Sequence, residues 1–175
     1  MLSLLVEMPI VMPPVVAGLA LLAAFGRRGL VGVWLAGWGV QIPFTITAVV
    51  LAQLFVSAPF YIRTAQARFS TLSRDLEEAA SMDGASTAQI FWYITLPLSR
   101  SALWMGLALC WARALGEFGA TILFAGNLAG RTQTMPLLVY GALERDLGAA
   151  YTAALVLLGL AAAVLAFTRW LARWE

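Results

Sequence analysis

Histidine and lysine are absent from this chain of 175 residues, and cysteine occurs only once. Without histidine, no imidazole is available as a base or a metal ligand. Without lysine, a phosphate-binding loop of the Walker type cannot form, so any ATP that drives this protein must bind to another chain. The single cysteine, Cys110, excludes an intrachain disulfide and a CxxC metal site. We therefore expect no catalytic site, no metal site and no bound cofactor in this chain.

Charge is also scarce: charged residues make up 11% of the chain and hydrophobic residues 62%, against about 25% charged in soluble proteins. So much apolar surface predicts an all-α integral membrane protein with one transmembrane domain over residues 1–175. The net charge is +2, and every basic residue is an arginine. These arginines occur singly or in pairs and form no basic face, so we expect no binding to nucleic acid.

Four segments are long enough to cross about 30 Å of hydrocarbon as helices. The predicted spans are 4–25, 44–62, 103–124 and 147–168. Pro13 and Pro14 should kink or unwind the first span, and Pro59 should bend the last turn of the second. Arg113 lies about 11 residues into the third span, which at about 1.5 Å per residue places it near the membrane midplane.

Arginines near the span ends give a weak indication of orientation. If the connection between the second and third spans is cytoplasmic, that side holds six arginines and the other side four. This orientation places both termini in the cytoplasm. The six are Arg63, Arg68, Arg74, Arg100, Arg169 and Arg173.

The one long polar segment, residues 71–97, has the pattern of two short helices joined by an elbow. Ser73 can cap the first helix, and Gly84 can end it in the left-handed conformation. Ser86 with Gln89 forms a capping-box pattern for a second helix that should stop before Pro97. These residues alone allow two interpretations: a rigid cytoplasmic knob that docks into a partner, or an amphipathic linker on the lipid surface.

The same segment resembles the EAA loop of binding-protein-dependent ABC importer permeases. The matching positions are Glu78, Ala79, Ala80, Gly84, Ile94, Leu96 and Pro97. The resemblance implies a MetI-like helical bundle in a prokaryotic inner membrane, working as a homodimer. It also implies two ABC ATPase subunits, which hold ATP and magnesium, and an extracytoplasmic substrate-binding protein. By position, Glu78, Ala79, Ala80, Gly84 and Ala85 would form the contact with the ATPase subunit.

A second set of segments resembles permeases for molybdate and tungstate. Sulfate and thiosulfate permeases share the GEFGA-like core but match the segment 130–134 less well. The resemblance therefore implies import of an oxyanion, molybdate or tungstate before sulfate. The matching segments are 13–14, 26–29, 55–59, 112–121, 124–127 and 130–136.

The candidate residues of the translocation path each have a structural alternative. Arg113 could lower the electrostatic barrier to an anion, or it could simply pair with Glu117 four residues on. Arg131 could lower the same barrier. The polar side chains near the outer mouth, which could instead belong to a solvated loop, are Asn127, Thr132, Gln133 and Thr134. Proline residues 13, 14 and 59 are either gate elements or packing kinks.

Permeases of this type usually have five or six spans, so the resemblance leads us to expect that at least one N-terminal span is missing. Two rival classes remain. A secondary transporter should place coupling carboxylates at the midplane, where only Glu117 lies. An intramembrane enzyme needs a nucleophile and a base, for which the chain offers few candidates.

Overall fold

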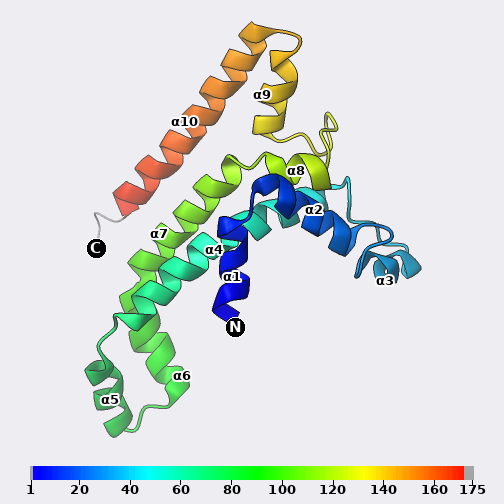
Figure 1. Cartoon of the computed structure of the whole chain (residues 1–175). Helices are drawn as coiled ribbons and strands as arrows, with labels where there is room; N and C mark the ends of the chain where they lie inside the picture. The colour runs from blue at the N-terminus through cyan, green and yellow to red at the C-terminus, as the bar shows by residue number, and fades with distance from the viewer. Residues whose placement is uncertain (1, 172–175) are drawn as a thin grey trace.

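The computed structural model describes residues 2–171, and every regular element in that range is helical (Figure 1). The all-α fold predicted from the sequence is confirmed. Arg173 and the terminal residues Met1 and Glu175 lie outside the described residues. The α-helices are α1 (Leu2–Val11), α2 (Pro14–Phe25), α3 (Gly32–Gly37), α4 (Ile46–Ser70), α5 (Arg74–Met82), α6 (Thr87–Ile90), α7 (Leu96–Leu115), α8 (Gly119–Phe124), α9 (Met135–Leu143) and α10 (Leu147–Leu171), with a π-helical turn at Phe91–Thr95.

Helices α4 and α7 form the most extensive pairing and lie side by side (Figure 1). Small residues let the two backbones approach, as is common between membrane helices. A Cβ added at Gly106 of α7 would lie only 3.1 Å from the Cβ of Thr64 in α4. Further along, the thiol of Cys110 donates to the hydroxyl of Ser57 at 3.3 Å. The two helices are thus closely packed at both positions.

Helices α2 and α8 make the second close crossing. A Cβ on Gly18 would lie 2.9 Å from the carbonyl oxygen of Ala120, and one on Gly119 would lie 2.8 Å from the Cβ of Pro14. Only glycine fits at either position without a shift of backbone. The buried core gathers around this crossing and the first half of α4. Its members are Ala17, Leu21, Ala48, Ala52, Val56, Ala120, Phe124 and Ala125.

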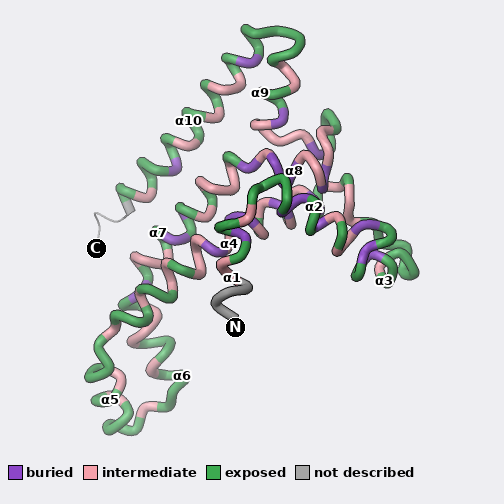
Figure 2. Tube along the Cα trace, in the orientation of Figure 1, coloured by how far each residue is buried: buried purple, intermediate pink, exposed green. Residues whose placement is uncertain are grey.

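Helices α9 and α10 form a hairpin on one side of α7. Most residues of α10 are exposed (Figure 2), including the large apolar residues Leu155 and Leu158. Exposed apolar surface of this extent suits contact with lipid. Within the described residues, α4 and α10 are the helices long and apolar enough to cross a bilayer. Sequence patterning predicted four such segments.

The first and third predicted spans are each divided in the structure. The first span divides at Met12 and Pro13 into α1 and α2, where the prolines had predicted a kink. The third is not one helix over 103–124, because α7 ends at Leu115 and α8 begins at Gly119. Consequently Arg113 lies in the last turn of α7 and not in the middle of one continuous helix, while its depth in the membrane stays a prediction.

Two predictions about proline also require correction. Helix α4 continues to Ser70, so Pro59 lies inside the helix and not in its last turn. Pro59 removes one backbone hydrogen bond within α4. The packing of α4 along α7 compensates for this loss, so the helix continues past the proline. The second helix of the polar segment does not stop before Pro97, because a π turn joins α6 to α7. That wider turn relieves the clash a proline ring makes with the preceding turn.

Candidate functional site

Residues 71–97, which we call the knob, protrude at the end of the α4–α7 pair (Figure 1). The first knob helix, α5, is capped by Ser73, whose Oγ accepts from the Asp75 N–H at 3.3 Å. Gly84 has φ +86°, the left-handed conformation predicted from the sequence. Around it the N–H of Ala85 donates to the carbonyl of Ala80 and the N–H of Gly84 to that of Ser81. This is a Schellman motif, and it satisfies the last carbonyls of α5.

The second half of the knob is also fixed by local hydrogen bonds. The Ser86 N–H donates to Gln89 Oε1 at 2.8 Å and the Gln89 N–H to Ser86 Oγ at 3.4 Å, so the predicted capping box is confirmed. The two halves are tied together by the Thr95 hydroxyl, which donates to Glu77 Oε1 at 2.8 Å. These bonds fix the shape of each half of the knob and link the two halves.

The outer surface of the knob is exposed (Figure 2). Glu78 and Ala79 are exposed, and Met82 has 88% of its surface accessible. A pocket of about 380 Å³ lies at the elbow. Its lining residues are Asp83, Gly84, Ala85, Gln89, Ile90, Tyr93 and Ile94. Exposed apolar side chains beside carboxylates and a small pocket are suited to contact with another protein.

The base of the knob is attached directly to both long helices. Only Thr71, Leu72 and Ser73 separate α4 from α5, and the π turn continues α6 into α7 without a break. Across this base the guanidinium of Arg68 donates to the carbonyl of Leu98 at 2.6 Å. A displacement of the knob is therefore passed to α4 and α7 together.

Arg113 and Glu117 lie together at the break between α7 and α8. Their side chains form an ion pair of 3.0 Å, with Arg113 30% exposed and Glu117 1% exposed. The other carboxylate oxygen of Glu117 accepts from the Ala120 N–H at 2.8 Å, which caps the start of α8. Each charge lies at the helix end whose dipole favours it. The predicted pairing is confirmed, and Glu117 also caps the helix that begins after the break.

Gln53 of α4, which sequence reasoning missed, completes this junction. Its side-chain amide donates to the carbonyl of Ala114 at 3.3 Å, close to the end of α7. The available signal was an amide side chain in the run 46–60, whose other polar residues are only Thr47 and Ser57. Pro13 occupies the N-cap position of α2, and the start of α2 lies beside the same junction, since Pro14 packs against Gly119. Two interrupted helices therefore meet here, whereas Pro59 lies further along α4.

A second ion pair was missed because its members come from separate helices. The guanidinium of Arg63 in α4 lies 2.6 Å from the carboxylate of Glu7 in α1, and both side chains are partly exposed. The pair fixes α1 against α4. The sequence placed Arg63 only at a span end and gave no indication of its partner.

The loop between α8 and α9 is held by its own side chains and is not a freely solvated segment. Thr132 is buried, and its hydroxyl accepts from the Leu128 N–H at 3.1 Å. Asn127 accepts from the amide of Gln133 at 3.0 Å and donates to the carbonyl of Leu137. Asn127 and Thr132 thus shape the loop. Arg131 is exposed and lines a different pocket from the one beside Asn127.

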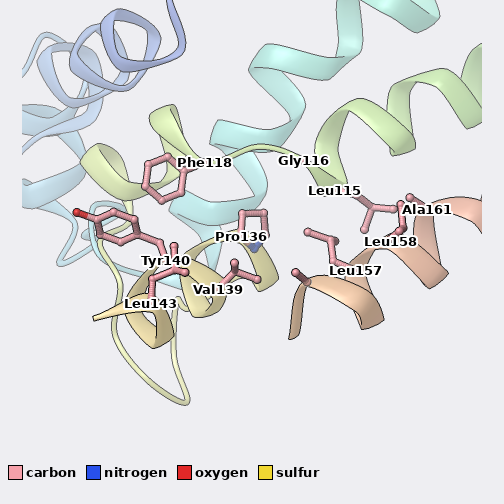
Figure 3. Close-up of a pocket in the computed structure, with 11 residues that line it drawn as sticks. Leu115, Gly116, Phe118, Pro136, Val139, Tyr140, Leu143, Leu157, Leu158 and Ala161 are labelled. Carbon is pink, nitrogen blue, oxygen red and sulfur yellow. The ribbon is translucent and has the colours of Figure 1, made fainter. Parts of the chain in front are cut away.

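An apolar pocket of about 590 Å³ lies between the end of α7 and the α9–α10 hairpin (Figure 3). Phe118 and Tyr140 face each other at its side, with ring centroids 5.3 Å apart. Leu157 and Leu158 of α10 contribute to the opposite wall. The sequence did not predict this pocket, because α9 is too short to be recognised as a span.

Comparison with known proteins gives consistent matches along the chain. The family of binding-protein-dependent transport system inner membrane components matches residues 1–174. The probable transport system permease protein NifC of Clostridium pasteurianum is 42% identical over 156 residues, which are 89% of this chain and 54% of that protein. The molybdenum transport system permease protein ModB of Mycobacterium tuberculosis is 44% identical over 160 residues, 91% of this chain and 61% of that protein.

The sulfate transport system permease protein CysW of Synechocystis is 41% identical over 133 residues, 76% of this chain and 48% of that protein. The chain therefore spans about half to three fifths of the length of these relatives. The family match nevertheless extends over nearly all of the chain, including the knob, the helix junction and the loop after α8. The chain belongs to the family of binding-protein-dependent transport system inner membrane components.

Proposed function

We propose that the chain is the permease subunit of an ATP-driven importer for a tetrahedral oxyanion, with molybdate or tungstate as cargo. The observation that carries this proposal is the knob, an exposed two-helix body joined to α4 by three residues and to α7 by a continuous helix. Helix α4 has 25 residues, about 37 Å at about 1.5 Å per residue, which is enough to cross a bilayer. A force applied to the knob would reach the far side of the membrane through α4.

The force would come from other subunits. Two ABC ATPase subunits, one on each permease of a homodimer, would hold ATP and magnesium and move the knobs on closing. An extracytoplasmic binding protein would deliver the oxyanion to the opposite side. Glu78, Ala79 and Ala85 are the proposed contact residues, while Gly84 keeps the elbow in shape. In this arrangement the chain breaks no covalent bond and changes only the access to its path.

The orientation follows from the same proposal. A knob that docks to an ATPase must be cytoplasmic, which agrees with the larger number of arginines near that side. The path would run beside the junction of the broken helices, where weakened segments at Pro13, Pro14 and Gly116 can rearrange. Arg113 is neutralised there by Glu117. We therefore assign Arg113 to holding the junction rather than to binding the anion.

Sulfate is the alternative cargo, because the relative from Synechocystis carries the name of a sulfate permease at a similar identity. A secondary transporter is the more remote alternative. The buried carboxylate that such a carrier would need at its centre is Glu117, and both of its oxygens already have partners in the ion pair and the cap of α8.

The test is stimulation of ATP hydrolysis in the complex of this chain with its ATPase and binding protein. Binding protein loaded with molybdate or tungstate should raise the hydrolysis rate, and sulfate-loaded protein should raise it less. Stimulation by sulfate alone would replace the proposed cargo by the alternative. Isolation of the active chain without any ATPase subunit, with uptake intact, would overturn the importer itself.

A further inference from the structure

A pocket of about 810 Å³ lies at the end of α4 opposite the knob. It is built from three separate parts of the chain: the end of α2, the loop before α4 and the loop after α8. Since the knob is proposed to be cytoplasmic, this pocket would open on the extracytoplasmic side. Its lining residues are Leu22, Gly26, Arg27, Gly39, Gln41, Pro43, Phe44, Thr45 and Arg131.

Two guanidinium groups and no carboxylate line this pocket. Arg27 donates to the neutral side chain of Gln41 at 2.8 Å, which orients the guanidinium and leaves its charge uncompensated. No ion pair involves Arg131 within residues 2–171. By contrast, the pocket beside Arg145 is also lined by Glu144 and Asp146. A concave surface with unpaired guanidinium groups attracts anions and matches the geometry of their oxygens.

The wall of this pocket is held in a strained backbone conformation. Phe44 has φ +62°, which is uncommon for a residue other than glycine. Its N–H donates to the carbonyl of Phe124 at 3.2 Å, and its ring lies against Gly126. Next to it, the hydroxyl of Thr45 caps α4 by accepting from the Ala48 N–H. Strain of this kind persists where surrounding contacts hold it, and such positions concentrate at ligand sites.

We propose that this pocket, formed around Arg27 and Arg131, receives the dianionic tetrahedral oxyanion on its way from the binding protein to the path. The proposal rests on the proposed function. Two guanidinium groups match a double negative charge, so molybdate, tungstate and sulfate should all bind here more strongly than a monovalent anion of similar size. Discrimination among molybdate, tungstate and sulfate must then come from a part of the importer other than this pocket.

The test measures binding of labelled molybdate by equilibrium dialysis to the complex of this chain and its ATPase, in phosphatidylcholine nanodiscs without binding protein. Arg27→Gln and Arg131→Gln should each weaken binding about tenfold, the effect of losing one hydrogen bond to a charged group. The matched control is Arg28→Gln, which removes the same charge at the neighbouring exposed residue outside the lining. Arg27→Lys keeps the charge but not the planar fork of donors, so it should weaken binding less than Arg27→Gln. Thermal unfolding should be unchanged in all four variants.

Each other outcome overturns the proposal in a different way. Equal binding in Arg27→Gln, Arg131→Gln and Arg28→Gln, or no binding by the unsubstituted complex, excludes the pocket as an anion site. If the two variants bind molybdate normally but no longer hold the binding protein, the pocket instead accepts acidic side chains of that partner. If their defect appears only with phosphatidylglycerol present, the ligand is a lipid headgroup. Normal uptake by the unsubstituted importer keeps the proposed function in all these cases.

Discussion

Replacing Gly84 with alanine tests whether the shape of the elbow, and not the chemistry of its side chain, makes the knob a docking device. Gly84 has φ +86°, and a Cβ added there would meet nothing within 4 Å. The cost of alanine is therefore purely conformational, about 1–2 kcal/mol for a left-handed residue. Asparagine adopts that conformation more easily than alanine, so Gly84→Asn should cost less.

That strain should appear as weaker attachment of the ATPase subunit. Residues 73–83 and 86–95 are held by their own caps, so the strain would be relieved by reopening the elbow between them. A cost of 1–2 kcal/mol corresponds to about a 5- to 30-fold smaller population of the docking shape. The affinity of the ATPase for the detergent-solubilised chain, measured by titration, should fall by up to this factor in Gly84→Ala and by less in Gly84→Asn.

The control is Gly159→Ala in α10, which also adds a methyl group into open space but at a helical position. It should leave the affinity unchanged. Wild-type affinity in Gly84→Ala would refute the reasoning, because the left-handed elbow would then be unnecessary. An equal loss in Gly84→Ala and Gly84→Asn would also refute it, since the effect would follow from any side chain and not from the backbone.

Three further predictions concern the caps and the helix crossings. Glu117→Gln should lower the free energy of unfolding by about 1–3 kcal/mol in thermal unfolding, which is less than for a fully buried pair because Arg113 is 30% exposed. Adding Arg113→Gln should recover part of this loss, and the absence of any recovery would contradict the ion pair. Gly18→Ala should cost about 1–3 kcal/mol by overpacking against α8, measured against Gly159→Ala, and equal stability of the two would show that the α2–α8 crossing is loose. Ser86→Ala should weaken ATPase attachment about fivefold, because it removes a helix cap that contributes about 1 kcal/mol. The unfolding temperature of the long helices should not change, and a global loss of stability would contradict the local role of this cap.

Features that depend on residues two to five positions apart were predicted from the sequence. The capping box at Ser86, the cap at Ser73 and the left-handed Gly84 are all confirmed, because each is decided by a local hydrogen bond or by backbone sterics. The pairing of Arg113 with Glu117 was predicted by the same spacing. The motif residues Ala80 and Gly84 additionally turn out to be the hydrogen-bonding positions of a Schellman motif.

Features that depend on tertiary contacts were not predicted. Nothing near Gly119 in the sequence indicates that Pro14 lies against it, so the break after Leu115 was missed. Pro97 was expected to end a helix, but a π turn and the packing of α7 on α4 carry the helix past it. Likewise Arg27 and Arg131 are about a hundred residues apart in the sequence and line the same pocket only in the folded chain. Periodicity and motif spacing contain no information on which residues the tertiary fold brings near one another.

The most direct measurement of the central claim is the initial rate of labelled molybdate uptake into proteoliposomes that contain the full chain and its ATPase, with loaded binding protein outside and ATP inside. Uptake should require ATP hydrolysis, should be inhibited by tungstate more than by sulfate, and should fall in Gly84→Ala in proportion to the loss of ATPase attachment. Uptake that continues without ATP, or that Gly84→Ala leaves unchanged while the ATPase is detached, would contradict a permease driven through its knob.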